Sequence, residues 1–375
     1  MNILVFSWRD PKHPLAGGAE QVMHEHMKGW IAAGHSVTLF SSYFKNAKRE
    51  EKLDEVKVIR RGIQYWGVQI LGALYYLFGN TKYDLVVDQF HGIPFFTPLY
   101  VRVPKLAVLQ EVARDVWLTN DLPFPFDKII GIIGYVGEPL LYLPYKKVNF
   151  MVGSESAKED VVKIGINKNL VTVVPHGVLL DDKPRVLPKK EKIITIVHLG
   201  ALAKDKGIED TIETFGLLNK VGKYQFWIIG RGGGAYLDYL KKKVRDLGIK
   251  ENTTFWGFVT DSEKFDLLAR AHVMINPSLL EGFGLVNIEA NTVGTPVVGY
   301  TSRGLVDSIR DGDSGALVSP NTPQALATSV DGIIRDGKTL RRLQKSSVKW
   351  SKNFTWEKSK KKSLQLIDVL IDKAH

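Results

Sequence analysis

Cysteine is absent from this sequence of 375 residues. Its absence excludes disulfide bonds, a catalytic thiolate and metal sites with cysteine ligands, and it is compatible with a reducing, cytoplasmic location. A secretory signal is not evident either, because the apolar run at residues 3–6 is short and leads into turn-forming residues instead of a cleavage site. We therefore expect the chain to begin folding at residue 1.

Acidic residues are fewer than basic ones: 40 Asp and Glu stand against 51 Lys and Arg, which gives a net charge of +11. This excess favours a negatively charged partner, which could be nucleic acid, an anionic membrane surface or a phosphorylated substrate. Nucleic acid is the weakest of the three, because no zinc finger, RNP-type sheet or basic helix accompanies the charge. Basic residues gather at positions 45–61, where a solvated lysine-rich face is the alternative interpretation.

Long apolar runs are scarce, but two stretches are unusually hydrophobic. Residues 62–79 carry no charge and favour a helix buried nearly all round; a membrane-docking or acceptor-lining helix is the alternative, and a spanning helix is disfavoured by length, glycines and glutamines. Residues 122–145 contain four prolines. They predict an irregular apolar lid or a surface for an apolar partner instead of one helix.

Strand-like runs rich in Val, Ile and Phe alternate with helical periods along the whole chain, which predicts an α/β fold with parallel sheets. The length exceeds what one hydrophobic core usually supports. A polar stretch with two prolines interrupts the alternation at residues 184–190. We therefore expect a first domain at residues 1–183, a linker at 184–190 and a second domain at 191–355, with a last helix at 356–375 that packs back on the first domain.

Residues 277–290 (PSLLEGFGLVNIEA) form the most informative segment. They follow a predicted strand at 273–275 and offer a turn with Gly282 and Gly284, then a helix. Backbone N–H groups of Phe283, Gly284 and Leu285 would point out of the helix N-terminus, which is a ready site for a diphosphate. The two glycines would let the backbone approach a ligand closely.

Two carboxylates flank that turn. Glu281 lies in the loop and Glu289 about one turn into the helix, and both can accept hydrogen bonds from ligand hydroxyls. The alternative interpretations are a solvated loop residue for Glu281 and a favourable placement near a helix N-terminus for Glu289. The spacing after a buried strand is more specific than either residue alone.

The segment resembles the E-x7-E signature of retaining glycosyltransferase family 4, whose members have the GT-B fold. The resemblance continues through Gly17-Gly18-Ala19-Glu20, Pro175-His176-Gly177-Val178 and residues 304–318, and so covers nearly the whole chain. It implies two Rossmann-like domains with a cleft between them, in which a nucleotide sugar is held mainly by the second domain.

The resemblance also assigns roles to residues. Glu281 would contact the transferred sugar, Glu289 the ribose, and the turn at 282–285 the phosphates and sugar, while the loop with Gly17 and Gly18 would face the donor phosphates. Lys206 matches the lysine of the family's G-R-L-x-x-x-K-G motif, and its charge would stabilise the diphosphate leaving group.

The sequence departs from the family at two places. Ala201 replaces the arginine of that motif, so Lys204 or Arg231 would have to take its place at the diphosphate. Gln110 stands where the family often has a histidine; a glutamine can orient a sugar hydroxyl but cannot titrate, and the neighbouring Glu111 could supply an acid or base.

A histidine after a predicted strand and an Asp-Gly-Asp sequence are further candidates for ligand and metal binding. His91 follows a predicted strand and could face the ligand, with a loop histidine bonded to backbone as the alternative. Asp311-Gly312-Asp313 resembles the metal-binding D-x-D of another glycosyltransferase fold, but it falls in a turn that already matches family 4. No other cluster has ligand spacing for a metal, so we expect neither a metal nor another cofactor.

These observations predict a retaining, metal-independent transfer of sugar from a nucleoside-diphosphate sugar to an acceptor hydroxyl. Basic charge and the two apolar stretches suggest a lipid-linked glycan as acceptor and peripheral contact with an anionic membrane on its cytoplasmic face. The alternatives are a non-catalytic subunit that binds a sugar nucleotide or glycan, favoured by Ala201 and Gln110, and a sugar-nucleotide epimerase of the same fold.

Overall fold

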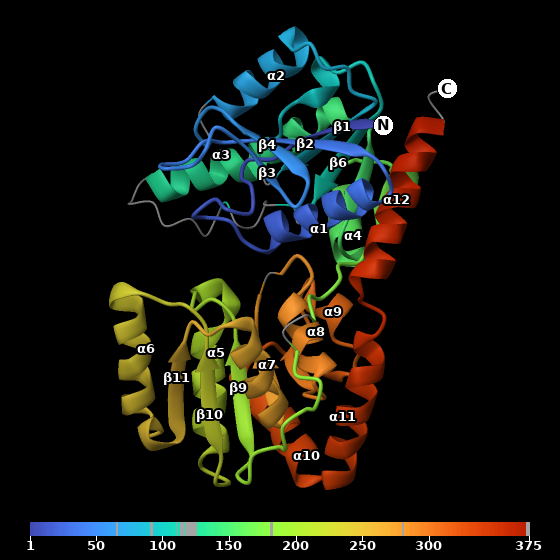
Figure 1. Ribbon diagram of the computed structural model, residues 1–375. Helices are drawn as coiled ribbons and strands as arrows, with labels where there is room; N and C mark the ends of the chain where they lie inside the picture. Colours follow the sequence, from blue (N-terminus) through green and yellow to red (C-terminus); the bar gives the residue numbers. More distant parts are fainter. Residues whose placement is uncertain are drawn as a thin grey trace. The chain divides into compact units, whose positions relative to one another are not determined.

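The computed structural model describes residues 1–64, 67–90, 93–110, 112, 117, 126–180, 183–279 and 281–372, and it divides the chain into two compact units (Figure 1). Unit 1 comprises Met1–Gly177 and Trp356–His375, and unit 2 comprises Val178–Thr355. The first boundary follows Gly177, a few residues before the one expected at residue 183. The last helix belongs to unit 1.

Unit 1 is built on an eight-stranded sheet with the order β3-β4-β2-β1-β5-β6-β7-β8. Neighbouring strands are parallel, except for the antiparallel pair β3 and β4. The strands are β1 Asn2–Phe6, β2 Ser36–Ser41, β3 Glu50–Leu53, β4 Val56–Arg60, β5 Leu85–Phe90, β6 Lys105–Leu109, β7 Asn149–Val152 and β8 Val171–Val173.

Helices cover both faces of this sheet. Side chains of α1 (Gly18–Ala32) and α12 (Trp356–Asp372) pack on one face in a single apolar cluster. The two helices lie side by side (Figure 1), and Trp30 of α1 donates a hydrogen bond to Ser363 of α12 over 3.1 Å. The other face is covered by α2 (Val68–Phe78), the end of α3 (Phe126–Leu141) and α4 (Glu155–Lys163).

The hairpin of β3 and β4 could not be recognised from the sequence. Its two-residue turn places Asp54 and Glu55 at φ values of 44° and 68°, a left-handed conformation that Asn-Gly or Asp-Gly usually supplies. The strand Glu50–Leu53 is charged and half exposed, so no apolar alternation marks it.

The same hairpin changes the interpretation of the basic residues at 45–61. Arg60 is wholly buried, and its guanidinium donates to both carboxylate oxygens of the equally buried Asp10 over 2.6 and 2.8 Å. Glu51 accepts from the same guanidinium, and Arg61 pairs with Glu50 at 2.7 Å. This segment is therefore partly neutralised within unit 1, and only part of it is a solvated face.

The structure differs from the expectation for the first apolar stretch and from part of the expectation for the second. Of the eleven residues of α2, only Val68 and Gly72 are buried, so this helix is not buried all round. In the second stretch, residues 126–141 form a regular helix, α3, instead of an irregular lid. Pro139 lies in its last turn, where it removes a single backbone bond. The exposed aliphatic residues of α3 agree with the alternative of an apolar surface. Among the described residues, no helix is long and apolar enough to cross a membrane.

Unit 2 contains a six-stranded parallel sheet with the order β11-β10-β9-β12-β13-β14. Counted within the unit, this is the strand order 3-2-1-4-5-6 of dinucleotide-binding Rossmann domains. The strands are β9 Thr195–Leu199, β10 Gln225–Ile229, β11 Thr253–Gly257, β12 Val273–Asn276, β13 Val297–Tyr300 and β14 Gly315–Val318. The helices are α5 Ile208–Leu218, α6 Gly234–Asp246, α7 Asp261–Arg270, α8 Leu285–Thr292, α9 Leu305–Ser308, α10 Pro323–Arg335 and α11 Gly337–Ser351.

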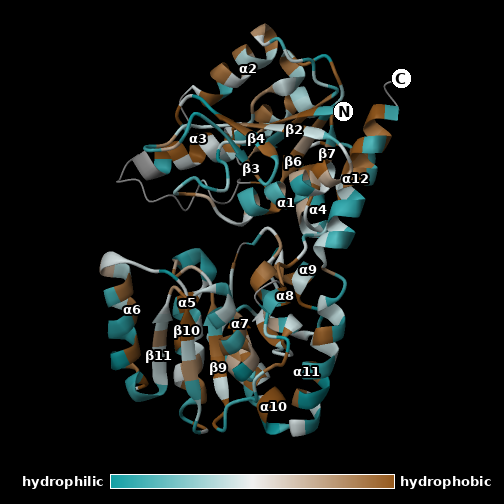
Figure 2. Ribbon diagram, in the orientation of Figure 1, coloured by the Kyte–Doolittle hydropathy of each residue, from teal (hydrophilic) through white to brown (hydrophobic). Residues whose placement is uncertain are grey.

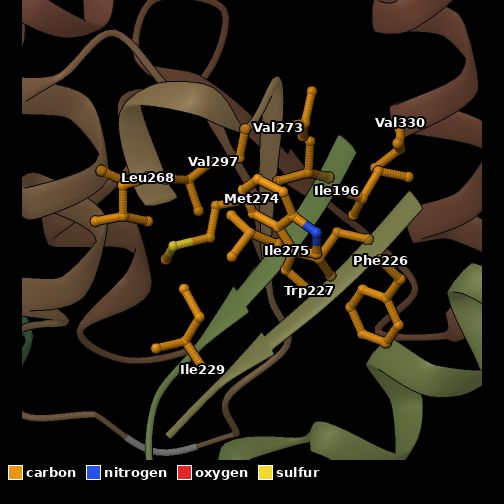
Figure 3. Packing of buried hydrophobic residues seen from close by; sticks show 14 of the residues in the cluster. Ile196, Phe226, Trp227, Ile229, Leu268, Val273, Met274, Ile275, Val297 and Val330 are labelled. Carbon is orange, nitrogen blue, oxygen red and sulfur yellow. The ribbon is translucent and has the colours of Figure 1, made fainter. Parts of the chain in front are cut away.

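The core of unit 2 explains why its strands read as apolar runs. Side chains of Ile196, Phe226 and Val273, in register on three neighbouring strands, are wholly buried on the same face of the sheet (Figure 3). Strands covered by helices on both faces bury nearly every side chain. The sheet therefore forms a rigid base for the loops that follow its strands.

Candidate functional site

The candidate site of unit 2 is built on the loops that follow β9 and β12. The strand order reverses between these two neighbours, and ligands of open parallel sheets bind at such a switch point. The two loops are tied together, because Leu279 N–H and the Ser278 hydroxyl both donate to the carbonyl of Asp205, over 3.1 and 3.2 Å. The loops therefore form one structural element at the switch point.

Gly284 caps the N-terminus of α8, at a position that only glycine can occupy without strain. Its φ is 81°, and a Cβ there would lie 2.8 Å from both Asn287 Nδ2 and Ser308 Oγ. The first N–H groups of a helix lack partners within the helix and give its N-terminus partial positive charge. The chain can thus turn sharply into α8 and direct this end toward an anion.

A buried polar network supports the turn from below. Asn276 at the end of β12 donates to Asn287 Oδ1 over 2.7 Å, and Asn287 Nδ2 donates to Ser308 Oγ over 2.9 Å. All three side chains are buried. Sequence reasoning missed this network, since asparagines in a helix and after a strand give no signal that they meet.

The two predicted catalytic residues are neighbours in the structure. Lys206 ends the short 3-10 helix η5 (Lys204–Lys206), and its Nζ lies 3.1 Å from Oε1 of Glu281. Both side chains are partly exposed, so a ligand can reach them. Gly304 packs against the backbone of Glu281, where a Cβ would come within 2.2 Å of its carbonyl oxygen; this contact fixes the loop that carries the carboxylate.

Glu289 lies on the first turns of α8 and has a partner that the sequence did not reveal. Lys264 of α7 binds its carboxylate at 2.8 Å and also binds Asp261 at 2.7 Å. Burial raises the pKa of Glu289, against the opposing pull of Lys264. Burial disfavours the charged form of Lys264, but its two carboxylate partners outweigh that effect and raise its pKa. In the sequence, the only sign of a partner for Lys264 was Asp261, three residues before it.

The residues that could replace the missing arginine are exposed. Ala201 and Lys204 are exposed on the loop after β9. Arg231 follows β10, and its guanidinium lies over the ring of Phe258, 4.6 Å from the ring centre. Its carbonyl accepts a hydrogen bond from Leu202 N–H over 2.9 Å, which keeps the loops after β9 and β10 together.

In unit 1, Gly17 caps α1 and Gly18 begins it. The carboxylate of Glu20 accepts from Gly17 N–H over 2.7 Å and pairs with Arg9 at 2.9 Å, so the start of this helix is already partly neutralised by the chain itself. Gln110 is buried directly after β6. His91 and Glu111 lie outside the described residues, as does Leu280 of the signature segment.

Two family models together match residues 16–350. The first, described as Glycosyltransferase Family 4, matches residues 16–182, and the second, described as Glycosyl transferases group 1, matches residues 181–350. The chain belongs to glycosyltransferase family 4. The resemblance stated from the E-x7-E segment and the two-domain GT-B fold are thereby confirmed.

One curated relative and two solved structures are similar to this chain over nearly its whole length. An uncharacterized glycosyltransferase of Methanocaldococcus jannaschii is 26% identical over 90% of this chain and 90% of its own. The fold is similar to that of sucrose-phosphate synthase from Thermosynechococcus elongatus, with a TM-score of 0.79, 19% identity and 99% of both chains covered. It is also similar to Anabaena HepE in complex with UDP-glucose, with a TM-score of 0.72, 16% identity, and 98% of this chain and 100% of that one covered.

The acids of Asp311-Gly312-Asp313 have local partners in this glycosyltransferase. Asp311 accepts from Leu317 N–H over 3.0 Å, and Asp313 pairs with Arg310 at 3.2 Å. Within the part of the chain that the structure describes, no three histidine or carboxylate side chains gather as a metal site would require.

If Glu289 holds the ribose of a donor, as the resemblance implies, donor binding should depend on pH. The carboxylate offers two charged acceptor oxygens to two hydroxyls, whereas the protonated form replaces one of them by an O–H donor. The raised pKa means that the carboxylate is lost at a higher pH than for an ordinary glutamate. We expect the KM for the donor to rise as pH falls from neutral. Glu289→Gln should raise KM about tenfold to a hundredfold at neutral pH and remove the pH dependence. An unchanged pH profile in Glu289→Gln would argue against this role.

His198 should make unit 2 sensitive to acid. It is fully buried on β9 with a pKa of about 4, because burial disfavours its charged form. The unfolded chain binds a proton below pH 6.5 while the folded one does not, so the free energy of unfolding falls as pH drops from 6.5 toward 4. The loss is about 2 kcal/mol at pH 5. Urea unfolding at pH 7 and pH 5 should show a smaller decrease for His198→Gln than for the unmodified protein; equal decreases would refute the assignment.

Proposed function

We propose that this glycosyltransferase moves a sugar from a nucleoside-diphosphate sugar to an acceptor hydroxyl, with retention of anomeric configuration and without a metal ion. The observation that carries the proposal is the cluster around the start of α8. There the helix N-terminus, Lys206 and Glu281 meet at the switch point of the sheet. Anabaena HepE, which shares the fold, binds UDP-glucose, and this supports a nucleotide-sugar donor here.

Each group has a part in the proposed reaction. The N-terminus of α8 and Lys206 would receive the charge that develops on the diphosphate as the bond from the sugar's C1 to the phosphate oxygen breaks. Glu281 would hold the transferred sugar by its hydroxyls, and Glu289 the ribose. The acceptor oxygen bonds to C1 on the face that the diphosphate leaves, and its proton passes to the departing phosphate oxygen. No protein nucleophile is needed, so the protein contributes position and charge.

We further propose that the acceptor is a glycan carried on a lipid. The support is the charge of +11 on the chain and the apolar residues exposed on unit 1, among them Ile70, Phe78 and Ile133. A lipid-linked acceptor would present its hydroxyl at a membrane surface.

Incubation with a panel of UDP-, GDP- and ADP-sugars tests the reaction. We expect one donor to give nucleoside diphosphate at the same rate with and without chelator, and an α-linked donor to give an α-linked product by NMR. Inversion at C1 or loss of activity in chelator would contradict the mechanism. A new sugar nucleotide in place of the diphosphate would identify an epimerase, and binding without turnover a non-catalytic subunit.

A further inference from the structure

Helix α3 presents its apolar side to solvent. Its inward face is formed by small and polar residues: Gly134 packs against the ring of Trp117, and the buried carboxylate of Glu138 accepts from Trp117 Nε1 over 3.1 Å. Its outward face carries aliphatic residues at helical spacing, each 50 to 65% exposed: Ile129, Ile132, Ile133, Val136 and Leu140. A surface helix ordinarily buries such a stripe, but among the described residues nothing covers this one.

Helix α2 repeats the arrangement. It faces the core through Gly72, where a Cβ would lie 3.0 Å from the ring of Phe6. Its outward residues are again apolar, between 39 and 78% exposed: Ile70, Leu71, Leu74, Leu77 and Phe78. The helix contains no charged residue. Figure 2 shows the hydrophobic colouring of both helices.

Both helices lie on the same face of the sheet. Residues in register on parallel strands point to the same side of the sheet, as do residues two positions apart on one strand. Leu4 is in register with Val86, and Asp88, two positions after Val86, is in register with Ala107. Leu4, Val86 and Ala107 therefore share a face. The cluster that contains Leu4 and Val86 packs against α2 residues, and the cluster that contains Ala107 packs against Leu141 of α3. Helix α2 and the end of α3 therefore cover the same face of the sheet, and both helices leave apolar residues exposed.

Basic residues flank the two apolar stripes. Lys82 follows α2, Lys128 lies at the start of α3, and Lys146 and Lys147 follow its end, all of them exposed. Between the end of α2 and residues 98–103 lies a hollow of about 820 Å³, lined by Leu77 and Lys82 among others. Apolar stripes with cations at their ends are typical of helices that lie in the interface of an anionic membrane.

We propose that the outward faces of α2 and α3, together with these flanking lysines, form one docking surface for an anionic lipid bilayer. The surface extends over two helices whose exposed residues are almost entirely aliphatic, which suits a bilayer that accepts apolar side chains without specific partners. The biological role of this docking rests on the proposed function, because the enzyme would meet a lipid-linked acceptor at the membrane. Docking itself needs neither donor nor acceptor.

Vesicle flotation tests the surface without substrates. The full chain should float with vesicles of phosphatidylglycerol and phosphatidylcholine at moderate salt, and at least about tenfold less with phosphatidylcholine alone, because the cations need anionic lipid. The double variant Ile133→Glu/Val136→Glu should reduce the partition coefficient on anionic vesicles at least about tenfold. Val369→Glu is the matched control, since Val369 is 47% exposed on α12, which covers the other sheet face, and it should bind as the unmodified protein does.

The proposal is overturned if the unmodified protein stays with the aqueous fraction, or if the double variant floats as well as Val369→Glu. It is also overturned if sedimentation without lipid shows a dimer that the double variant dissociates, because the stripes would then cover a second copy of the chain. Thermal melting of both variants checks their fold. Release of nucleoside diphosphate in free solution is measured separately, so a failure of docking is distinguishable from a failure of the proposed reaction.

Discussion

Lys206→Ala is expected to lower kcat for transfer about a hundredfold to a thousandfold. The Nζ of Lys206 lies 3.1 Å from Glu281, and in the proposed reaction it stabilises charge that appears on the leaving diphosphate. Removal of one such preorganised group typically costs two to three orders of magnitude in rate. The measurement is the steady-state rate of nucleoside diphosphate release at saturating donor.

Two further variants separate the effect of the Lys206 charge from a general effect of removing a lysine. Lys241→Ala removes an exposed lysine of α6 and should leave kcat within about twofold, because surface charges away from the site contribute little. Lys206→Arg keeps the charge and should recover part of the lost rate. A rate for Lys206→Ala equal to that of Lys241→Ala would mean that Lys206 plays no part in leaving-group stabilisation.

Gly284→Ala should both destabilise unit 2 and weaken donor binding. The left-handed backbone at φ 81° and the contacts of 2.8 Å with Asn287 and Ser308 together cost about 3 kcal/mol, the sum of backbone strain and overpacking. Relief of that strain would rotate the first amides of α8 away from their present direction. We expect urea unfolding to show the loss of stability and calorimetry to show donor affinity reduced at least about tenfold.

Gly294→Ala provides the matched control for this experiment. Gly294 also has a positive φ, of 76°, but it follows the other end of α8, and the nearest atom to an added Cβ is 3.4 Å away. It should lose about 1–2 kcal/mol of stability from the backbone alone and keep its donor affinity. If Gly284→Ala binds donor as tightly as Gly294→Ala, the start of α8 is not where the diphosphate lies.

The sequence predicted the fold where one physical pattern dominates. In unit 2, strands buried on both faces gave apolar runs such as the predicted strand at 273–275, which lies within β12. The hairpin at 50–60 was missed because Asp54 and Glu55 adopt a turn that other residues favour. The prediction that residues 62–79 form a helix buried nearly all round failed for α2, because hydropathy does not reveal which side of a helix meets the core. In this helix Gly72, and not the leucines, meets the sheet.

The candidate site was predictable where its residues are close in sequence. Glu281, Gly284 and Glu289 follow one strand, and the spacing alone placed them around a helix N-terminus. Lys206 came from the family motif, and the structure places it beside Glu281. Lys264 and the Asn276–Asn287–Ser308 network were missed, because they depend on contacts between α7, α8, α9 and β12 that no local spacing encodes.

A crystal of the protein soaked with UDP, GDP or ADP tests the central claim most directly. The account predicts the diphosphate against the backbone amides of Gly284 and Leu285, with Lys206 beside it and the ribose hydroxyls on Glu289 in place of Lys264. A nucleotide bound at any other loop of unit 2, with Lys206 still paired to Glu281, would contradict it.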